Sequence, residues 1–268
     1  MQIEYNPDLI LTQEHTAAEI RNYTGSFCGF VLLREPQYDL AALAERLQKQ
    51  GIAVAASGAE TAFVQDLMLD VPGAMVTISL FPEPIPDGEA EAASVHAKWD
   101  GAQAAAENHK AHLMIAVLPD TLSAMDAGHL YCRILSAALQ APQALAAYTS
   151  GTIIAPIQFQ QDSEQSADAL LLDTLIYIGT YSRDGGNCGY TIGMDAFGKD
   201  ELEILDCEEP FIAIEYILQE CAKRILTDAT PTGWYFTVDM NGITWEGRRR
   251  DGVMVEGHSL QLTRLFSD

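Results

Sequence analysis

Apolar residues occur along the first 155 residues in two patterns, short unbroken runs and runs with helical spacing. An unbroken apolar run bounded by turn residues is typical of a buried strand, whereas apolar residues three and four apart predict a helix. The predicted strands are residues 28–33, 74–81, 111–118 and 148–154. The predicted helices are residues 40–47, 89–109 and 122–139. We therefore expect strand and helix to alternate from residue 28 to about residue 155.

Residues at the ends of these elements indicate where the elements begin and end. Asp39 precedes the first helix as a capping residue, and Gly51 follows it as a terminator. Pro82, Pro84 and Pro86 follow the second strand. Because a proline nitrogen cannot donate a hydrogen bond to a sheet, these three residues predict that the strand ends at residue 81.

Residues 158–170 are the most polar and least periodic stretch, and we interpret them as a linker. This linker would divide the chain into a front half, residues 1–157, and a back half, residues 171–268. The two halves could also pack as one domain, because length alone permits either arrangement.

Turn residues that tolerate positive φ dominate the back half. Asp184-Gly185-Gly186-Asn187 and Asn241-Gly242 each lie between two apolar stretches, which predicts two hairpins. The predicted elements of this half are the hairpins 174–194 and 235–245, a helix that starts at Pro210, and a strand at 258–266.

These elements predict the α+β fold class. We expect a helix-rich front half with a ferredoxin-like or mixed four-stranded sheet, followed by a hairpin-rich antiparallel back half. Strands joined through helices can be parallel or antiparallel, and hydrophobic periodicity does not distinguish these arrangements.

The net charge of the chain argues against two classes of binding partner. Lys and Arg number 15 against 38 Asp and Glu, so the formal net charge is −23. A field of this sign repels nucleic acid and anionic lipid, and we expect neither as a partner. With 48% hydrophobic residues the chain still has the composition of a folded protein. The basic run Arg248-Arg249-Arg250 is flanked by Glu246, Asp251 and Glu256, which favours internal salt bridges.

The N-terminus and the cysteines predict a soluble cytoplasmic protein. Met1-Gln2-Ile3-Glu4-Tyr5-Asn6-Pro7 contains neither a basic segment nor an apolar segment of the kind found in signal peptides. No stretch approaches the roughly 20 apolar residues of a membrane span. Five cysteines without a C-x-x-C pair indicate reduced thiols.

Four residues form the strongest candidate for a metal site. His109-x-x-His112 and His129-x-x-Cys132 are of the right type for zinc. We favour packing or capping roles for these histidines, because His109 shares a helical face with apolar residues and His112 opens a strand. Cys132 beside His129 is also a weak candidate nucleophile. We expect no cofactor, since no phosphate-binding glycine motif occurs.

Acidic residues gather after two predicted strands, and these clusters supply the candidate binding residues. Carboxylates beyond a strand end can bind a cation or act as acids and bases, although with 38 acidic residues we favour a solvated surface. The candidates of the first cluster are Glu83, Asp87, Glu89 and Glu91. The candidates of the second are Asp195, Lys199, Asp200 and Glu201.

Several strings resemble a bacterial family known as domain of unknown function 4261. They cover residues 28–206 and comprise Gly29–Leu33, Ser79–Glu91 with Trp99, His109–Met114, Tyr148–Thr152 and Gly189–Glu201. The resemblance implies a cytoplasmic bacterial protein, often encoded alone or near toxin-related genes. It supplies no catalytic residues.

Two hypotheses of function follow. The first is a non-catalytic acidic binding protein, of the immunity or adaptor type, that recognises a basic protein partner, because acidic surfaces accelerate association with basic ones. The alternative is a metal-assisted hydrolase that uses the first acidic cluster together with His109 or His112. We favour the first, since no set of catalytic residues is apparent. The oligomeric state is open.

Overall fold

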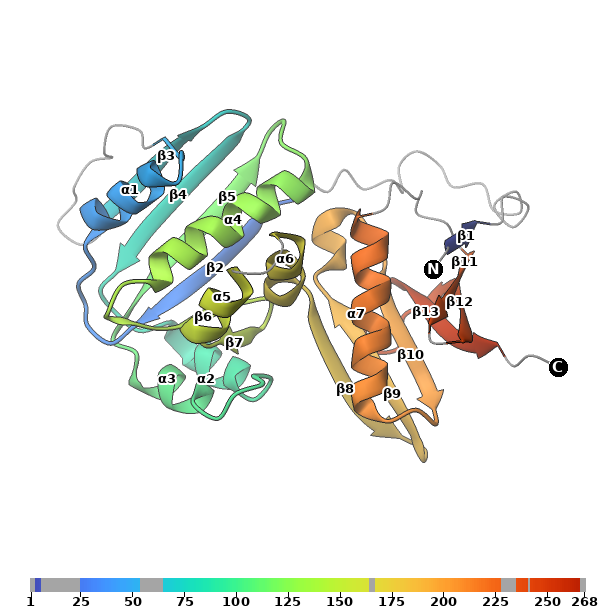
Figure 1. Cartoon of the computed structure of the whole chain (residues 1–268). Helices are drawn as coiled ribbons and strands as arrows, with labels where there is room; N and C mark the ends of the chain where they lie inside the picture. Colours follow the sequence, from blue (N-terminus) through green and yellow to red (C-terminus); the bar gives the residue numbers. More distant parts are fainter. Residues whose placement is uncertain are drawn as a thin grey trace. The chain divides into compact units, whose positions relative to one another are not determined.

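Two sheets, each with its own hydrophobic core, organise the chain (Figure 1). The computed structural model describes residues 3–5, 25–53, 65–163, 167–227, 235–240 and 242–265. The front unit is Thr24–Leu175, and the back unit is Ile176–Asp268 together with Met1–Tyr23. The fold is α+β, as the sequence predicts.

The front unit contains an antiparallel sheet in the order β3-β4-β5-β2-β6-β7. Its strands are β2 (Phe27–Leu33), β3 (Gln65–Val71), β4 (Ala74–Phe81), β5 (Ala111–Pro119), β6 (Ala144–Thr149) and β7 (Thr152–Ile154). One face is crossed by α1 (Leu40–Lys49) and α4 (Ala124–Leu139), as Figure 1 shows. Beside α4 lie α5 (Pro156–Ser163) and α6 (Ala167–Leu175).

The opposite face of this sheet is covered over only part of its area. The 3-10 helix η2 (Pro86–Gly88), α2 (Glu89–Ser94) and α3 (Ala102–Asn108) precede β5. Alanines of α2 and α3 pack in one cluster with Leu32 of β2, Ala146 of β6 and Ile153 of β7. The helices therefore cover the β2–β6–β7 part of this face.

Strand β2 lies between the two layers of helices. A Cβ atom on Gly29 would lie 2.2 Å from the Tyr131 hydroxyl of α4, so Gly29 faces α4. Because side chains alternate along a strand, Val31 and Leu33 face α4 as well. Phe30 and Leu32 face the other side. Val31, Leu32 and Leu33 have no exposed surface, which explains the unbroken apolar run that predicts this strand.

The helices predicted at 40–47 and 122–139 are confirmed as α1 and α4. The Asp39 carboxylate accepts a hydrogen bond of 2.9 Å from the Ala42 amide, which is the capping interaction predicted for α1. Ser123 caps α4 in the same way, through the Asp126 amide. The C-terminal carbonyls of α4 are bound by Tyr38 and Arg46, which donate to Ala138 and Ala137.

Four details of the predicted front half are wrong. The sheet has six antiparallel strands rather than four. Residues 148–154 form a hairpin, because Ser150 and Gly151 adopt positive φ and turn the chain. The predicted helix 89–109 is interrupted, since the Trp99 indole packs against Gly101 and donates to the Ile153 carbonyl at 3.0 Å. Strand β3 is absent from the prediction because the outward-facing Met68 breaks its apolar–polar alternation.

The linker predicted at 158–170 is also wrong for the residues that the structure describes. Residues 156–163 and 167–175 are helical. Phe159 of α5 and Leu170–Leu172 of α6 are buried, so apolar packing holds a segment whose composition resembles a linker. The boundary between the units follows Leu175.

The back unit contains a sheet in the order β1-β11-β12-β13-β10-β9-β8. Its strands are β1 (Ile3–Tyr5), β8 (Tyr177–Arg183), β9 (Gly186–Ile192), β10 (Glu201–Cys207), β11 (Tyr235–Met240), β12 (Ile243–Asp251) and β13 (His258–Leu265). Helix α7 (Phe211–Thr227) packs on β8, β9 and β10. Both predicted hairpins are confirmed. The expectation of a wholly antiparallel sheet is wrong, because α7 and the β11–β12 hairpin return the chain so that β13 runs parallel to β10.

No helix in the described ranges is long and apolar enough to cross a membrane.

The replacement Gly29→Ala tests the contact between β2 and α4. Besides the Tyr131 hydroxyl, the new Cβ would lie 2.8 Å from the Tyr148 carbonyl oxygen, so β2 and α4 would have to move apart. We expect a loss of about 1–3 kcal/mol in the free energy of unfolding, measured by urea denaturation. Tyr131→Phe should recover part of this loss in the double variant, because it removes the nearest atom. An unchanged free energy for Gly29→Ala would contradict this packing.

Candidate functional site

The first acidic cluster lies on the connection between β4 and α2 and in the first turn of α2. Glu83, Asp87 and Glu89 are exposed and Glu91 is half-buried; we call these four residues the acidic ridge. Asp87 and Gly88 adopt left-handed conformations, with φ of 60° and 69°, and turn the chain into α2. Ile85, which lies between Glu83 and Asp87, is buried in the cluster beneath α2 and α3.

Two histidines hold this connection in place through its backbone. The Ile85 amide donates to His109 Nε2 at 2.8 Å, and His109 Nδ1 hydrogen-bonds with the Ala106 carbonyl oxygen. Because Nε2 accepts, the ring is neutral and Nδ1 carries the proton. His112 Nδ1 donates to the Glu83 carbonyl oxygen at 2.9 Å. The ridge is therefore presented by a braced loop.

A row of rings joins the ridge to the sheet. Phe81 of β4 stacks on His112 of β5 with centroids 4.9 Å apart and an interplanar angle of 10°. His112 meets Phe30 of β2 edge-on at 5.4 Å, and Phe30 stacks on Tyr148 of β6 at 5.7 Å. The Tyr148 hydroxyl donates to Glu89 Oε1 at 2.7 Å. The row thus connects four neighbouring strands to the first turn of α2.

Burial affects the two titratable rings of this row. It lowers the pKa of His112, which favours the neutral imidazole, although the hydrogen bond to the Glu83 carbonyl acts in the opposite direction. Burial raises the pKa of Tyr148 to about 12, and the neighbouring Glu89 carboxylate adds to this effect. Tyr148 therefore remains a hydrogen-bond donor to Glu89 at neutral pH.

The acidic ridge differs from the acidic residues of the back unit in its ion pairs. Within the described part of the chain, none of its four carboxylates forms an ion pair with Lys or Arg. Arginines pair with five carboxylates of the back unit. These pairs are Arg183–Asp184, Arg183–Asp206, Arg248–Glu246, Arg249–Asp200 and Arg264–Glu209. Glu83, Asp87 and Glu89 are thus available to solvent or to a partner, whereas Glu91 Oε2 is buried.

The second acidic cluster has mainly structural roles. The buried Glu201 accepts hydrogen bonds from the Thr191 hydroxyl and the Gly193 amide, both at 2.7 Å, and so fixes the turn before β10. Asp200 binds Arg249, and burial lowers the pKa of Lys199. Asp195 is exposed. These contacts stabilise the back unit. They engage Glu201 and Asp200 within the fold, so the four predicted residues do not face one common site.

Glu203, on the same strand, holds a second loop. Its fully buried carboxylate accepts from the Val253 and Met254 amides and from the Ser259 hydroxyl. A buried carboxylate with several donors is a stable arrangement. The predicted internal role of the basic run is confirmed for Arg248 and Arg249.

The candidate metal ligands do not converge. Among the residues that the structure describes, no three or more His, Cys, Asp and Glu side chains are grouped to hold a metal ion. Both ring nitrogens of His109 are hydrogen-bonded, and His129 Nε2 lies 3.0 Å from an Asp168 carboxylate oxygen of α6. Cys132 is buried, and burial raises the pKa of its thiol to about 12, which opposes a nucleophilic role.

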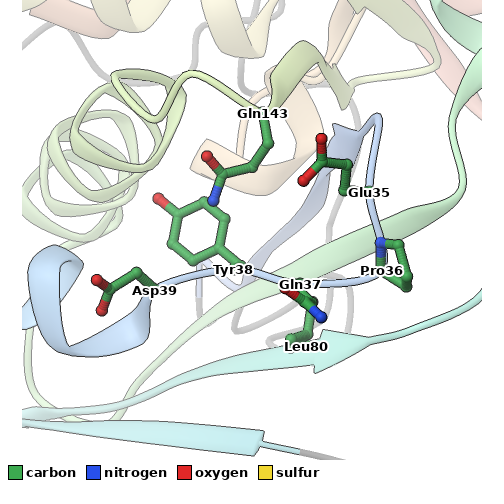
Figure 2. Close-up of a pocket in the computed structure, with 7 residues that line it drawn as sticks. All are labelled: Glu35, Pro36, Gln37, Tyr38, Asp39, Leu80 and Gln143. Carbon is green, nitrogen blue, oxygen red and sulfur yellow. The ribbon is translucent and has the colours of Figure 1, made fainter.

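A hollow of about 450 Å³ lies at the start of α1, and Figure 2 shows the residues around it. It is lined by Glu35, Pro36, Gln37, Tyr38, Asp39, Leu80 and Gln143. The Tyr38 hydroxyl and the Asp39 carboxylate are already engaged at the ends of α4 and α1. None of the residues predicted from the sequence as site residues lines this hollow.

Sequence reasoning missed the ring residues Phe30, Phe81 and Tyr148 as parts of the site. Each lies in a predicted strand, but only the pairing of those strands brings them together.

No protein-family model, curated protein or solved structure matches the chain.

The replacement of His109 tests the bracing of the loop. His109→Ala leaves the buried Ile85 amide without an acceptor, and we expect a loss of about 1–3 kcal/mol in the free energy of unfolding. His109→Gln is the matched control, because its amide oxygen can replace Nε2 and should retain most of the stability. Amide hydrogen exchange at Ile85 should accelerate in the alanine variant alone. Equal exchange rates in both variants would contradict the bracing role.

Replacement of His112 tests the effect of burial on its protonation. Because the folded pKa is lowered, the unfolded chain binds the proton more readily. The His112 contribution to stability is therefore present above the ordinary histidine pKa of about 6.5 and is lost as the pH falls toward the folded value. His112→Asn keeps a donor for the Glu83 carbonyl but does not titrate. Urea denaturation between about pH 5 and pH 7 should show a smaller pH dependence for this variant. The same dependence in both proteins would contradict this account.

Proposed function

We propose that this protein is a non-catalytic binding protein, of the immunity or adaptor type, whose front unit recognises a positively charged protein through the acidic ridge. The observation that carries the proposal is the combination of four carboxylates that form no ion pair with Lys or Arg in the described part of the chain, two on a loop held by two buried histidines and two at the start of α2. A braced loop loses little conformational freedom on binding, which favours affinity.

The distribution of cations supports this choice of surface. None of the six strands of the front sheet contains a Lys or Arg residue. Arg46 and Arg133 donate instead to backbone carbonyls of Ala137 and Gln50 on the helical side. The strands of this sheet therefore bring no cation to the ridge, and an excess of carboxylates steers cationic partners during association.

The alternative of a metal-assisted hydrolase has no comparable support. Such a site needs several ligands around one point, and His109 uses both ring nitrogens within the fold. The resemblance to domain of unknown function 4261, with the cytoplasmic location that it implies, also stays a prediction.

Affinity capture from a lysate of the native host tests the proposal. The immobilised baits are the native chain, a ridge variant and a control variant, all used at low ionic strength. The ridge variant carries Glu83→Gln, Asp87→Asn, Glu89→Gln and Glu91→Gln. The control variant removes the same number of charges from exposed positions of the back unit, with Asp184→Asn, Glu208→Gln, Asp251→Asn and Glu256→Gln.

We expect a basic protein to be retained by the native and control baits and lost from the ridge variant. For the purified partner, the association rate should fall at least about tenfold in the ridge variant, because steering by such fields contributes 10- to 1000-fold. Equal losses in both variants would indicate a non-specific charge effect. Retention of no basic protein by the native bait would also overturn the proposal.

A further inference from the structure

The face of the front sheet opposite α4 has an apolar region beside the part that α2 and α3 cover. Met68 of β3, Met75 of β4 and Leu118 of β5 are exposed by 40%, 51% and 38%, and Met114 of β5 is half-buried. We call these four residues the methionine face. Monomeric proteins rarely leave contiguous apolar side chains in solvent without a binding role.

Strand register makes this region continuous. Met75 pairs directly with Leu118, so the two side chains lie next to each other on the same face. Met68 pairs with Thr77, which lies two residues after Met75 on β4. Met114 lies between Ser79 and Phe30 of the neighbouring strands. Three adjacent strands therefore contribute to one apolar surface.

Carboxylates border this surface on two sides. Asp66 and Asp70 lie two residues before and after Met68 on β3, so all three side chains are on the same face of the sheet. Asp70 pairs directly with Met75. On the other side, Phe81 ends β4 and the chain continues into the acidic ridge at Glu83. The six strands of this sheet include no Lys or Arg residue. An apolar centre with a rim of a single charge is complementary to an amphipathic segment of opposite charge.

We propose that the methionine face binds a basic amphipathic α-helix of the partner protein, with its apolar side on the methionines and its Lys and Arg residues toward Asp66, Asp70 and the ridge. This inference rests on the proposed function, since it names the part of the cationic partner that is recognised. Methionine suits this role because its flexible, polarisable side chain adapts to the apolar groups placed on it.

The dimensions favour a helix over other occupants. Three antiparallel strands span two inter-strand spacings, about 10 Å, which is about the diameter of an α-helix. A second copy of this chain would place the same carboxylates opposite each other. At a net charge of −23 that arrangement is repulsive.

Methyl NMR of the full chain with ¹³C-methyl methionine tests the inference. The probe is a synthetic helical peptide of about 18 residues, five turns, with leucines on one side and lysines and arginines on the other. We expect the methyl resonances of Met68, Met75 and Met114 to shift during the titration. Met254 of the back unit, exposed by 47%, is the matched control for non-specific contact. Met125 of α4 is half-buried and reports on the integrity of the front unit, and the buried Met194 and Met240 report on the back unit.

Substitutions complete the test. The double variant Met75→Gln with Leu118→Gln should weaken peptide binding at least tenfold, while Ile157→Gln with Ile212→Gln should leave it unchanged. Ile157 and Ile212 are also exposed, by 57% and 79%, so the two variants make similar polar changes. An unchanged resonance of Met125 would show that a loss of binding does not reflect unfolding of the front unit.

The possible results separate this inference from the proposed function. If the peptide binds in a ridge-dependent manner while Met68, Met75 and Met114 do not shift, the inference is wrong and the proposed function stands. If these methyl resonances shift equally with Met254, or shift with protein concentration in the absence of peptide, non-specific contact or self-association replaces the proposed occupant. If neither the ridge nor the methionine face affects binding, both proposals fail.

Discussion

Burial of strand β2 on both faces is the constraint on which the front unit depends. Val31 and Leu33 pack toward α4, whereas Leu32 packs toward α2 and α3, so one strand belongs to two cores. Helices cover the whole of one face but only part of the other, because α2 and α3 are short and lie near β6 and β7. This incomplete covering leaves the methionine face on β3, β4 and β5 in solvent.

The two units manage their negative charge differently. In the back unit, carboxylates are buried as acceptors for loop amides or paired with arginines, as Glu203 and Asp200 illustrate. In the front unit, Arg46 and Arg133 donate to carbonyls at helix ends, and the ridge carboxylates form no ion pair with Lys or Arg in the described part of the chain. The same excess of acid therefore stabilises one unit and leaves carboxylates without ion pairs on the other, where we propose a recognition surface. Salt should weaken the second effect more than the first, because buried pairs are less screened.

Much of the fold follows from local patterns. The apolar run of β2, the cap of α1 and the hairpin at Asp184-Gly185 are predictable because the physical cause lies within a few residues. Predictions fail where a distant contact decides the conformation. Helix α5 forms because Phe159 is buried, although its composition resembles a linker, and the helix predicted at 89–109 is interrupted where Trp99 reaches Ile153.

The sequence by itself determined the net charge, the position of the acidic ridge after β4 and most of the strands that support it. Only the tertiary structure decided which side chains meet. Strand order placed Phe81, His112, Phe30 and Tyr148 in one row, and register brought Met75 against Leu118. Pairing between strands is non-local, since a side chain's face is defined only once the strand's neighbours and their register are known. For that reason the carboxylates were visible in the sequence, whereas the apolar surface beside them was not.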